Sequence, residues 1–329
     1  MNISINKLRE KVLSTFHENG FSDSDAERTV DYLLWAEMSG NKTQGLIKMT
    51  GTEPLQGIKA LYSPKVERDT KLSQLIDGGA NPAPVVASLG TDIAISKAKE
   101  HGFGIVGVRN TFSSNGAQAY YAEKIAENDL IGIVCSRSPA STAGFGSIDP
   151  IFGTNPLGYA FPTNKRPFVF DMATSAMTFY GLVLAKAKNE TIPENMAIDK
   201  NGQPTTDPAE AMSGALLPFD HSYKGSGLAM MVETLAGPLI NGAWIDNKTF
   251  DKEWGSIFIA IDPNLLIDIV DFKSHATQMI EDILSARTKS ESSPIRLPGT
   301  HSSDNRLAAE SSGFIDVDEV VLRQLGYIE

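Results

Sequence analysis

The middle of this chain alternates short apolar strand patterns with helical patterns, and this alternation constrains its fold more than any other feature. Buried strands are predicted by the apolar runs at residues 104–110, 130–136, 168–171 and 256–262. Apolar residues at helical spacing predict helices over 90–101, 116–128, 174–187 and 224–240. A further short strand is expected at 72–76, before a turn. Alternation of this kind is typical of a sheet that is covered by helices.

Both ends of the chain are mainly helical. Periodic apolar residues predict helices over 5–19, 24–38, 273–288 and 317–326. The second of these begins with a capping-box pattern at 24–27, and a serine-rich loop joins the last two. Residues 188–223 are polar and rich in turn residues, and the run IDKNGQPTTDP (198–208) within them predicts an exposed loop. We therefore expect an α/β (mixed α+β) middle part and a helical part that the two termini build together.

Charge and composition exclude several classes of function. The chain has 29 Lys and Arg residues against 40 Asp and Glu residues, which leaves a formal net charge of −11. This acidic balance argues against binding to nucleic acid or to an anionic membrane surface, because both need clustered basic residues. No apolar run approaches the roughly 20 residues of a membrane span. The N-terminal segment lacks the apolar stretch of a signal peptide, so a cytoplasmic protein is expected.

No metal site is expected either. Cys135 is the single cysteine, which excludes an internal disulfide and a cysteine-based zinc cluster. The histidines are scattered through the chain, and no two of them stand four residues apart, as two metal ligands on one helix face would.

The run Gly102-Phe-Gly104-Ile-Val-Gly107 fits the G-x-G-x-x-G pattern of dinucleotide sites. In a Rossmann fold this pattern follows a strand and begins a helix, so that the cofactor pyrophosphate meets the helix N-terminus. Here the predicted order is reversed, since a helix precedes Gly102 and a strand follows it. We therefore interpret the run as a helix stop that leads into a buried strand.

Asp171 lies where the strand at 168–171 ends and the next helix is predicted to begin. Ligands commonly bind at such strand ends in α/β sheets, and an acid beside Thr174 and Ser175 suits a polar ligand. A simple helix cap would have the same residues, so the segment by itself leaves both interpretations open.

Lys224 and Gly225 begin a predicted helix, where the helix dipole disfavours a cation. The arrangement is explained if an anion lies there, bound by Lys224 and by free backbone N–H groups. An exposed lysine after a loop is the alternative. The segments 153–156 and 296–301 by themselves predict only a turn and a loop.

Taken together, these segments resemble the type-2 malate/L-lactate dehydrogenase family of NAD(P)-dependent oxidoreductases. This family includes 2-oxo acid reductases, ureidoglycolate dehydrogenases and cyclic ketimine reductases. The resemblance is carried by IFGTNPLGYAFP (151–162), PFVFDMATS (167–175), IPENMAIDKNGQPTTDP (192–208), GALLPF with KGSGLAMMVETLAG (within 214–237) and RLPG (296–299). The order and spacing of these segments cover nearly the whole chain.

The resemblance implies a non-Rossmann fold, with a central mixed-sheet cofactor domain (71–269) and a helical domain formed by both termini (1–70 plus 270–329). It also implies NADH or NADPH as the cofactor, a small carboxylate-bearing substrate, and a homodimer whose sites are completed near the subunit interface. By position, the residues expected to line the cofactor are Ser138, Asp171, Met172, Ala173, Thr174, Ser175, Lys224, Gly225, Gly299, Thr300 and His301.

The phosphates of such a cofactor need partners. From the resemblance, Lys224 and the backbone at Gly225 are expected to hold phosphate or ribose. Arg137, beside Ser138, is a candidate partner for the 2′-phosphate that distinguishes NADPH from NADH.

The acid/base residues that the family usually presents are replaced in this chain. The family has a Ser-His-Gly triplet followed by an arginine, whereas residues 43–45 read Thr-Gln-Gly and Lys48 replaces the arginine. A second family histidine is also missing, in the region of Ser113 and Ser114. Glutamine hydrogen-bonds a carbonyl but exchanges no proton near neutral pH. Lysine pairs with a carboxylate only as a point charge, without the two-pronged fork of arginine.

Three interpretations follow from these replacements. The chain is a 2-oxo acid reductase with a different proton donor, for which Lys48, Asp171, His221 and a bound water are candidates. Alternatively, it reduces a cyclic ketimine, whose C=N group already carries its proton, or it binds the nicotinamide without catalysis. For catalysis we expect Gln44 to hydrogen-bond the reacting C2 substituent and Lys48 to pair with the substrate carboxylate. Asp171 is expected to orient the nicotinamide end or to relay a proton.

Overall fold

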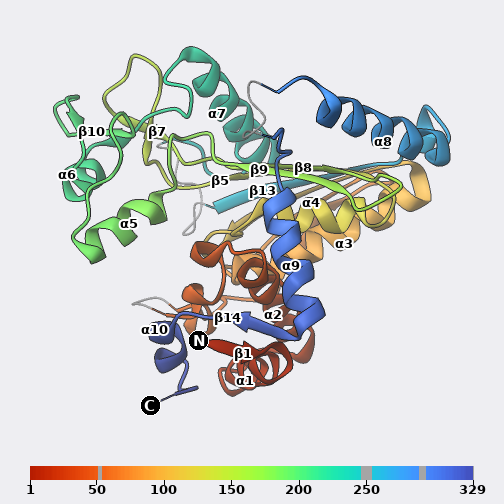
Figure 1. The fold of residues 1–329 in the computed structure, drawn as a ribbon, viewed down its shortest axis with the longest axis horizontal. Helices are drawn as coiled ribbons and strands as arrows, with labels where there is room; N and C mark the ends of the chain where they lie inside the picture. Colours follow the sequence, from red (N-terminus) through yellow and green to blue (C-terminus); the bar gives the residue numbers. More distant parts are fainter. Residues whose placement is uncertain (51–53, 246–253, 289–293, 329) are drawn as a thin grey trace.

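The structure is a computed structural model that describes residues 1–50, 54–245, 254–288 and 294–328 (Figure 1). Its helices are α1 (Ile5–Glu18), α2 (Asp23–Met38), α3 (Ala83–His101), α4 (Gln118–Ala126), α5 (Phe179–Lys188), α6 (Pro208–Ser213), α7 (Tyr223–Ala236), α8 (Ile269–Ser285), α9 (Thr300–Ser312) and α10 (Glu319–Gln324). Short 3₁₀ helices between them include η1 (Lys42–Gln44), η2 (Leu46–Met49), η3 (Leu55–Gly57) and η4 (Pro238–Ile240).

The strands are β1 (Asn2–Ser4), β2 (Lys65–Asp69), β3 (Ser73–Asp77), β4 (Phe103–Thr111), β5 (Ile131–Arg137), β6 (Thr142–Ala143), β7 (Pro150–Phe152), β8 (Leu157–Phe161), β9 (Phe168–Met172), β10 (Ala197–Ile198), β11 (Pro204–Thr205), β12 (Ala215–Leu216), β13 (Trp254–Ile261) and β14 (Phe314–Asp316).

Within the described residues, seven strands form one mixed sheet in the order β2-β3-β4-β13-β5-β8-β9. β3 and β4 run parallel and are joined by α3, whereas the other neighbouring pairs are antiparallel. The predicted strands are all present, as β3, β4, β5, β9 and β13. The mixed sheet is therefore confirmed, and it differs from a Rossmann sheet, whose strands are mostly parallel.

Strand glycines let helices pack closely on both faces of this sheet. A Cβ at Gly104 would overlap the carbonyl oxygen of Ala94 in α3, and a Cβ at Gly255 would overlap that of Ala236 in α7. Gly102 ends α3 in the left-handed conformation, with a φ of 82°. The G-x-G-x-x-G run is therefore a helix stop and a buried strand, as predicted.

The two termini meet in one helical part of the molecule. β1 and β14 pair antiparallel, with Ile3 opposite Ile315, so that the first and last segments lie side by side (Figure 1). α1 buries Leu8, Val12 and Phe16, and it packs against α2. This arrangement confirms the predicted helical part built from both ends.

Two segments differ from their predictions. The 188–223 segment is not a plain loop, because it holds α6 and the strands β10, β11 and β12, which join β6 and β7 in a second small sheet. Each of those three strands has two residues, which is too short for an alternating pattern to show. α9 occupies part of the predicted serine-rich loop. Ser, Thr and Asn are weak helix formers, so this helix depends on tertiary contacts.

Several helix starts also differ from their predictions, since α3 begins at Ala83 instead of 90 and α8 begins at Ile269 instead of 273. α2 is capped by Ser22, whose Oγ accepts the Asp25 N–H at 3.2 Å, so the cap lies two residues before the predicted Ser24. α5 begins at Phe179 instead of 174, because the Oγ1 of Thr178 caps it.

Segments on the outer side of each predicted domain boundary, at 70 and at 270, contact the sheet part of the molecule. β2 precedes the first boundary and pairs with β3. α8 spans the second boundary, where Lys273 pairs with Asp129 at 2.8 Å and the Oγ1 of Thr277 accepts the Asn164 N–H at 3.0 Å. Both partners lie on connections between sheet strands.

Candidate active site

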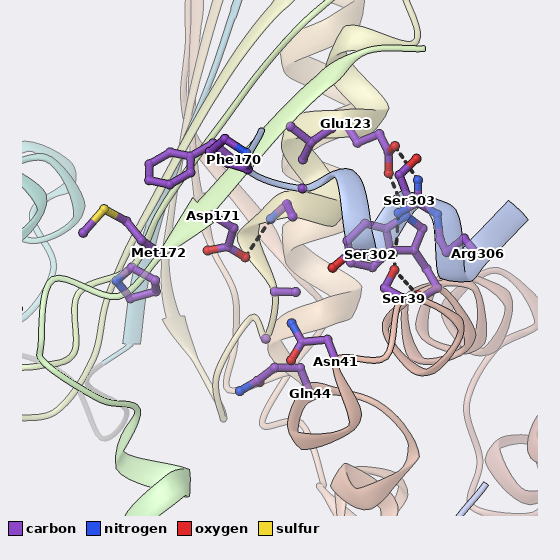
Figure 2. A pocket seen from close by; sticks show the side chains of 18 of the residues that line it. Ser39, Asn41, Gln44, Glu123, Phe170, Asp171, Met172, Ser302, Ser303 and Arg306 are labelled. Atoms are coloured by element: carbon purple, nitrogen blue, oxygen red, sulfur yellow. Dashed lines mark hydrogen bonds and ion pairs between the residues drawn. The ribbon is translucent and has the colours of Figure 1, made fainter. Parts of the chain in front are cut away.

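A cavity of about 990 Å³ lies where β9 and α4 meet the first 3₁₀ helices and the start of α9 (Figure 2). Its wall comes from segments that are far apart in the chain. The lining includes residues from 32–58, 113–123, 163–173, 178–180, 277–284 and 295–306. Ligand pockets commonly measure roughly 300–1,000 Å³, so this cavity has room for a large ligand.

Asp171, near the end of β9, faces this cavity (Figure 2). Its Oδ2 accepts the N–H of Ala119, in the first turn of α4, at 3.0 Å. Burial raises the pKa of the Asp171 carboxyl to about 6, and hydrogen bonds from the N–H groups of Ala119 and Gln118 partly oppose this rise. A carboxyl with this pKa exchanges a proton close to neutral pH.

Gln44, the last residue of η1, lies on a different segment of the wall, below Asp171 in Figure 2. Its Oε1 is buried and has no hydrogen-bond partner among the residues that the structure describes. The Oγ of Ser113, another lining residue, is in the same state. Because a buried acceptor without a donor is costly, both atoms are suited to bind donor groups of a ligand.

Lys48, in η2, lines the cavity and is half-buried. Its Nζ lies 5.5 Å from the centroid of the Tyr180 ring. Burial lowers the pKa of the Lys48 ammonium to about 8, and no carboxylate in the described part of the chain offsets this effect. A cation in such a place suits an anionic ligand.

The side chains predicted as catalytic therefore share one cavity, but the predicted cofactor residues divide into two sets. The cofactor residues in the wall are Asp171, Met172, Ala173, Gly299 and Thr300. Those outside the described wall are Ser138, Thr174, Ser175, Lys224, Gly225 and His301.

Part of the second set lies directly behind the wall. The N–H of Thr154 donates to Ser138 Oγ at 3.1 Å, and Thr174 Oγ1 donates to the carbonyl oxygen of Thr154 at 3.1 Å. Thr154 itself lines the cavity. Ser175 follows on this segment, where its Oγ donates to the Met177 carbonyl oxygen at 2.7 Å.

Gly299 presses the segment before α9 onto β9. Its φ is 75°, which favours glycine, and a Cβ there would overlap the carbonyl oxygen of Val169. The start of α9 is thereby held next to the strand that carries Asp171. His301 is exposed, with its Nε2 3.4 Å from the side-chain nitrogen of Asn305.

The start of α7 corrects one expectation. Asp220 Oδ1 accepts the N–H of Gly225 at 3.0 Å, and Ser222 Oγ accepts the N–H of Lys224 at 3.1 Å. The prediction of free N–H groups at this helix start is therefore wrong, because the chain caps the helix with its own side chains. Asp220 is the anion that the helix dipole favours there. The Lys224 side chain is exposed.

Arg137 and His221 also lie elsewhere. Arg137 is 1% exposed, and its Nε lies 3.2 Å from Glu233 Oε1, so it forms an internal ion pair instead of facing a phosphate. His221 is exposed, and its backbone N–H donates to the Pro218 carbonyl oxygen at 3.0 Å. Because His221 is not among the described lining residues, it is removed as a candidate proton donor.

The sequence reasoning missed a polar group at one end of the cavity. The Trp35 Nε1 donates to Glu123 at 2.8 Å, Arg306 forms an ion pair with the same carboxylate, and the guanidinium lies 4.8 Å from the Trp35 ring centroid (Figure 2). These residues come from α2, α4 and α9. No local pattern distinguishes them, or Tyr180, from other helix residues, and the fold alone brings them together.

The described residues contain no group of three or more His, Cys, Asp or Glu side chains placed to hold a metal ion. None of the described helices has both the length and the apolar character needed to cross a membrane.

Comparison with known proteins supports one family. The family model described as malate/L-lactate dehydrogenase matches residues 3–326. A malate/(S)-sulfolactate dehydrogenase of Methanothermus fervidus is 33% identical over 99% of this chain and 96% of its own length. A Δ1-pyrroline-2-carboxylate/Δ1-piperideine-2-carboxylate reductase of Pseudomonas putida is 28% identical over 94% of this chain and 92% of its own length. The solved structure of malate dehydrogenase from Pyrococcus horikoshii has a TM-score of 0.86 at 30% identity, and the match covers 99% of this chain and 94% of that one. This chain is therefore an oxidoreductase that belongs to the malate/L-lactate dehydrogenase family.

Proposed function

We propose that this protein transfers hydride between NADH or NADPH and the C2 atom of a small 2-oxo acid, or in reverse from a 2-hydroxy acid. The observation that carries the proposal is that Gln44, Lys48 and Asp171 line one cavity, although they come from three separate segments. The Methanothermus relative supports it, because its name specifies malate and (S)-sulfolactate, which are both 2-hydroxy acids.

The residues of the cavity fit a nicotinamide cofactor. Gln44 Oε1 and Ser113 Oγ are buried acceptors without partners in the described part of the chain, and an amide group would satisfy such atoms. We assign the nicotinamide nucleotide to the 171–173 segment with Gly299 and Thr300. The residues outside the described wall, which are Ser138, Thr174, Ser175, Lys224, Gly225 and His301, remain predicted contributors. When bound, the cofactor supplies or accepts the hydride.

Side chains of the protein bind the substrate and transfer the proton. Lys48 is charged below its pKa of about 8, so it pairs with the substrate carboxylate at neutral pH. The Gln44 side-chain amide donates to the oxygen on C2. Asp171, with a pKa of about 6, gives the proton that the oxygen needs on reduction.

Reduction of a cyclic ketimine is the second candidate function. A protonated C=N group needs no acid from the protein, and this chain lacks both family histidines. The Pseudomonas relative, which is named for reduction of such cyclic imino acids, favours this candidate. The two candidates share the cofactor and the role of Lys48.

The test follows the absorbance of NADH and NADPH with the purified protein, using 2-oxo acids and cyclic ketimines in parallel. Turnover of 2-oxo acids supports the first function, and turnover of the ketimines alone supports the second. Cofactor binding without oxidation in either set contradicts both, and it leaves nicotinamide binding without catalysis. The same assay decides between NADH and NADPH.

We also propose a homodimer in which α8 takes part. Ala276 is the buried residue of this helix within the described part of the chain, while Val270, Met279 and Ile283 are 68%, 48% and 44% exposed. Exposed apolar surface of this kind is typical of protein contacts. Light scattering is expected to give twice the mass of one chain, and Met279→Asp with Ile283→Asp should lower it. A monomeric wild-type protein would contradict the proposal.

A further inference from the structure

The hydroxyl of Tyr32 lies between two segments of the cavity wall. It donates to the carbonyl oxygen of Gln44 at 2.8 Å and accepts the N–H of Ala117 at 3.1 Å. Tyr32 belongs to α2 and is 1% exposed. One buried hydroxyl therefore joins η1 to the segment that precedes α4.

The chain packs closely around this hydroxyl and its ring. A Cβ at Gly116 would overlap the Tyr32 hydroxyl, so glycine is required for the segment to lie on it. Gly116 also has a φ of 85°, which favours glycine independently. The Tyr32 ring stacks on Tyr121, with centroids 6.0 Å apart and planes within 4°, and it meets the edge of Tyr120 at 5.5 Å. The ring is therefore held on several sides.

The Tyr32 hydroxyl stays protonated at ordinary pH. Burial raises the pKa of this phenol, and a backbone hydrogen bond from Ala117 only partly opposes the rise. A neutral phenol donates one hydrogen bond and accepts another. Tyr32 is therefore suited to bridging the two segments and unsuited to relaying a proton.

The bridge continues to Asp171. Ala117 is the N-cap of α4, and its side chain forms no cap hydrogen bond. The free N–H groups at this helix start are bound instead by Tyr32 at Ala117 and by Asp171 at Ala119. A continuous path runs from the Gln44 carbonyl through Tyr32 and the first turn of α4 to the Asp171 carboxylate.

We propose that Tyr32 is a positioning residue that sets Gln44 and Asp171 relative to each other across the cavity. The inference rests on the proposed function of these two side chains, and it adds a buried residue of the same cavity wall that acts through them. Tyr32 links the segment of Gln44, which is predicted to replace the family histidine, to the segment that binds the Asp171 carboxylate.

Activity measurements test this role with Tyr32→Phe, which keeps the ring and removes the hydroxyl. Tyr120→Phe is the matched control, because its ring lies in the same cluster and its hydroxyl forms no hydrogen bond with the described residues. We expect Tyr32→Phe to lower kcat about ten- to one-hundredfold, with the cofactor dissociation constant unchanged, since small misplacements cost rates of this order. The control should keep wild-type kcat.

Two further readouts separate positioning from loss of stability. In a Gln44→Ala background, Tyr32→Phe should cause little further loss, because both changes remove the same arrangement. The limb of the pH–rate profile set by Asp171 should move to higher pH, because a weaker bond from Ala119 favours the protonated carboxyl. Fully additive losses with an unmoved pH profile would overturn the proposal.

Amide hydrogen exchange decides the question even if the proposed reaction is wrong. Tyr32→Phe should speed exchange in 44–49 and 116–119 together, while Tyr120→Phe should leave both unchanged. If wild-type protein turns over no tested substrate, the proposed function fails, and coupled exchange still supports the bridge. Unchanged exchange in both segments of Tyr32→Phe would overturn the bridge whatever the activity.

Discussion

The carboxylate of Glu37 in α2 accepts the N–H of Leu46 through Oε2 at 3.0 Å, and it thereby holds the first residue of η2. A Cβ at Gly45 would overlap the same oxygen, so a glycine there permits the contact. η2 carries Lys48. A buried acid of the helical part thus anchors the segment that brings a cation to the cavity.

Glu37 should make stability depend on pH. Burial raises the pKa of the Glu37 carboxyl from 4.5 to about 7 in the folded protein. The folded state then binds this proton more tightly than the unfolded state, so the contribution of Glu37 to stability falls as pH rises from about 4.5 to about 7. Glu37→Gln keeps an acceptor for the Leu46 N–H but has no titratable group there. We expect the free energy of unfolding of this variant, compared with wild type, to increase by about 1–3 kcal/mol as the pH rises from about 5 to about 8.

Urea unfolding at the two pH values measures this gain. Glu10→Gln, which changes an exposed glutamate of α1, is the control and should show no comparable gain. A difference between Glu37→Gln and wild type that stays the same at both pH values would contradict the prediction.

Asp171 should control the pH dependence of carbonyl reduction. Its pKa is raised to about 6, so the protonated donor is lost as the pH rises through that value. We expect wild-type kcat for a 2-oxo acid to fall above about pH 6, and Asp171→Asn to lower kcat roughly 10²-fold and remove this limb. The asparagine keeps an oxygen that accepts the Ala119 N–H. If the pH–rate profile of Asp171→Asn still shows this fall above about pH 6, the fall belongs to another group. The substitution should lower the rate of ketimine reduction much less.

Lys48 should act on substrate binding. Lys48→Ala is expected to raise KM about ten- to one-hundredfold, the size of one hydrogen bond to a charged group, while cofactor affinity stays nearly unchanged. In wild type, KM should rise as the pH passes about 8, because the pKa of the ammonium is lowered to about 8 by burial. Lys48→Arg, which stays charged, should lose this pH dependence. Equal losses of substrate and cofactor affinity in Lys48→Ala would refute this division of roles.

The ion pair of Arg306 with Glu123 should stabilise the position of α9. Their side chains are 12% and 7% exposed, and removing one partner leaves a charge poorly solvated. We expect Arg306→Ala to lower the free energy of unfolding by about 2–4 kcal/mol. Arg166→Ala is the control, because it removes an exposed ion pair with Asp304, which also lies in α9. It should lower the free energy of unfolding by less than about 1 kcal/mol. Equal costs for the two variants, measured by denaturant unfolding, would contradict this account.

The parts of the fold that the sequence predicts are those with long, local patterns. The apolar strands β4, β5, β9 and β13 and the amphipathic helix α1 follow from spacing alone, because burial of one face imposes a period on the residues. The two-residue strands within 188–223 are too short to show any period. α9 has weak helix formers, and it is held by contacts such as the one between Arg306 and Glu123.

The candidate site divides in the same way. The sequence by itself determined the family resemblance and the presence of Lys48 and Asp171 as chemically able side chains, and it predicted that Gln44 replaces the family histidine. Only the tertiary structure decided that these three share a cavity, that Tyr32 joins two of their segments, and that Asp220 occupies the start of α7. The physical reason is that hydrogen-bond partners and burial are set by segments far apart in the chain. Burial alone is what moves the pKa of Asp171 and of Lys48 toward neutral pH.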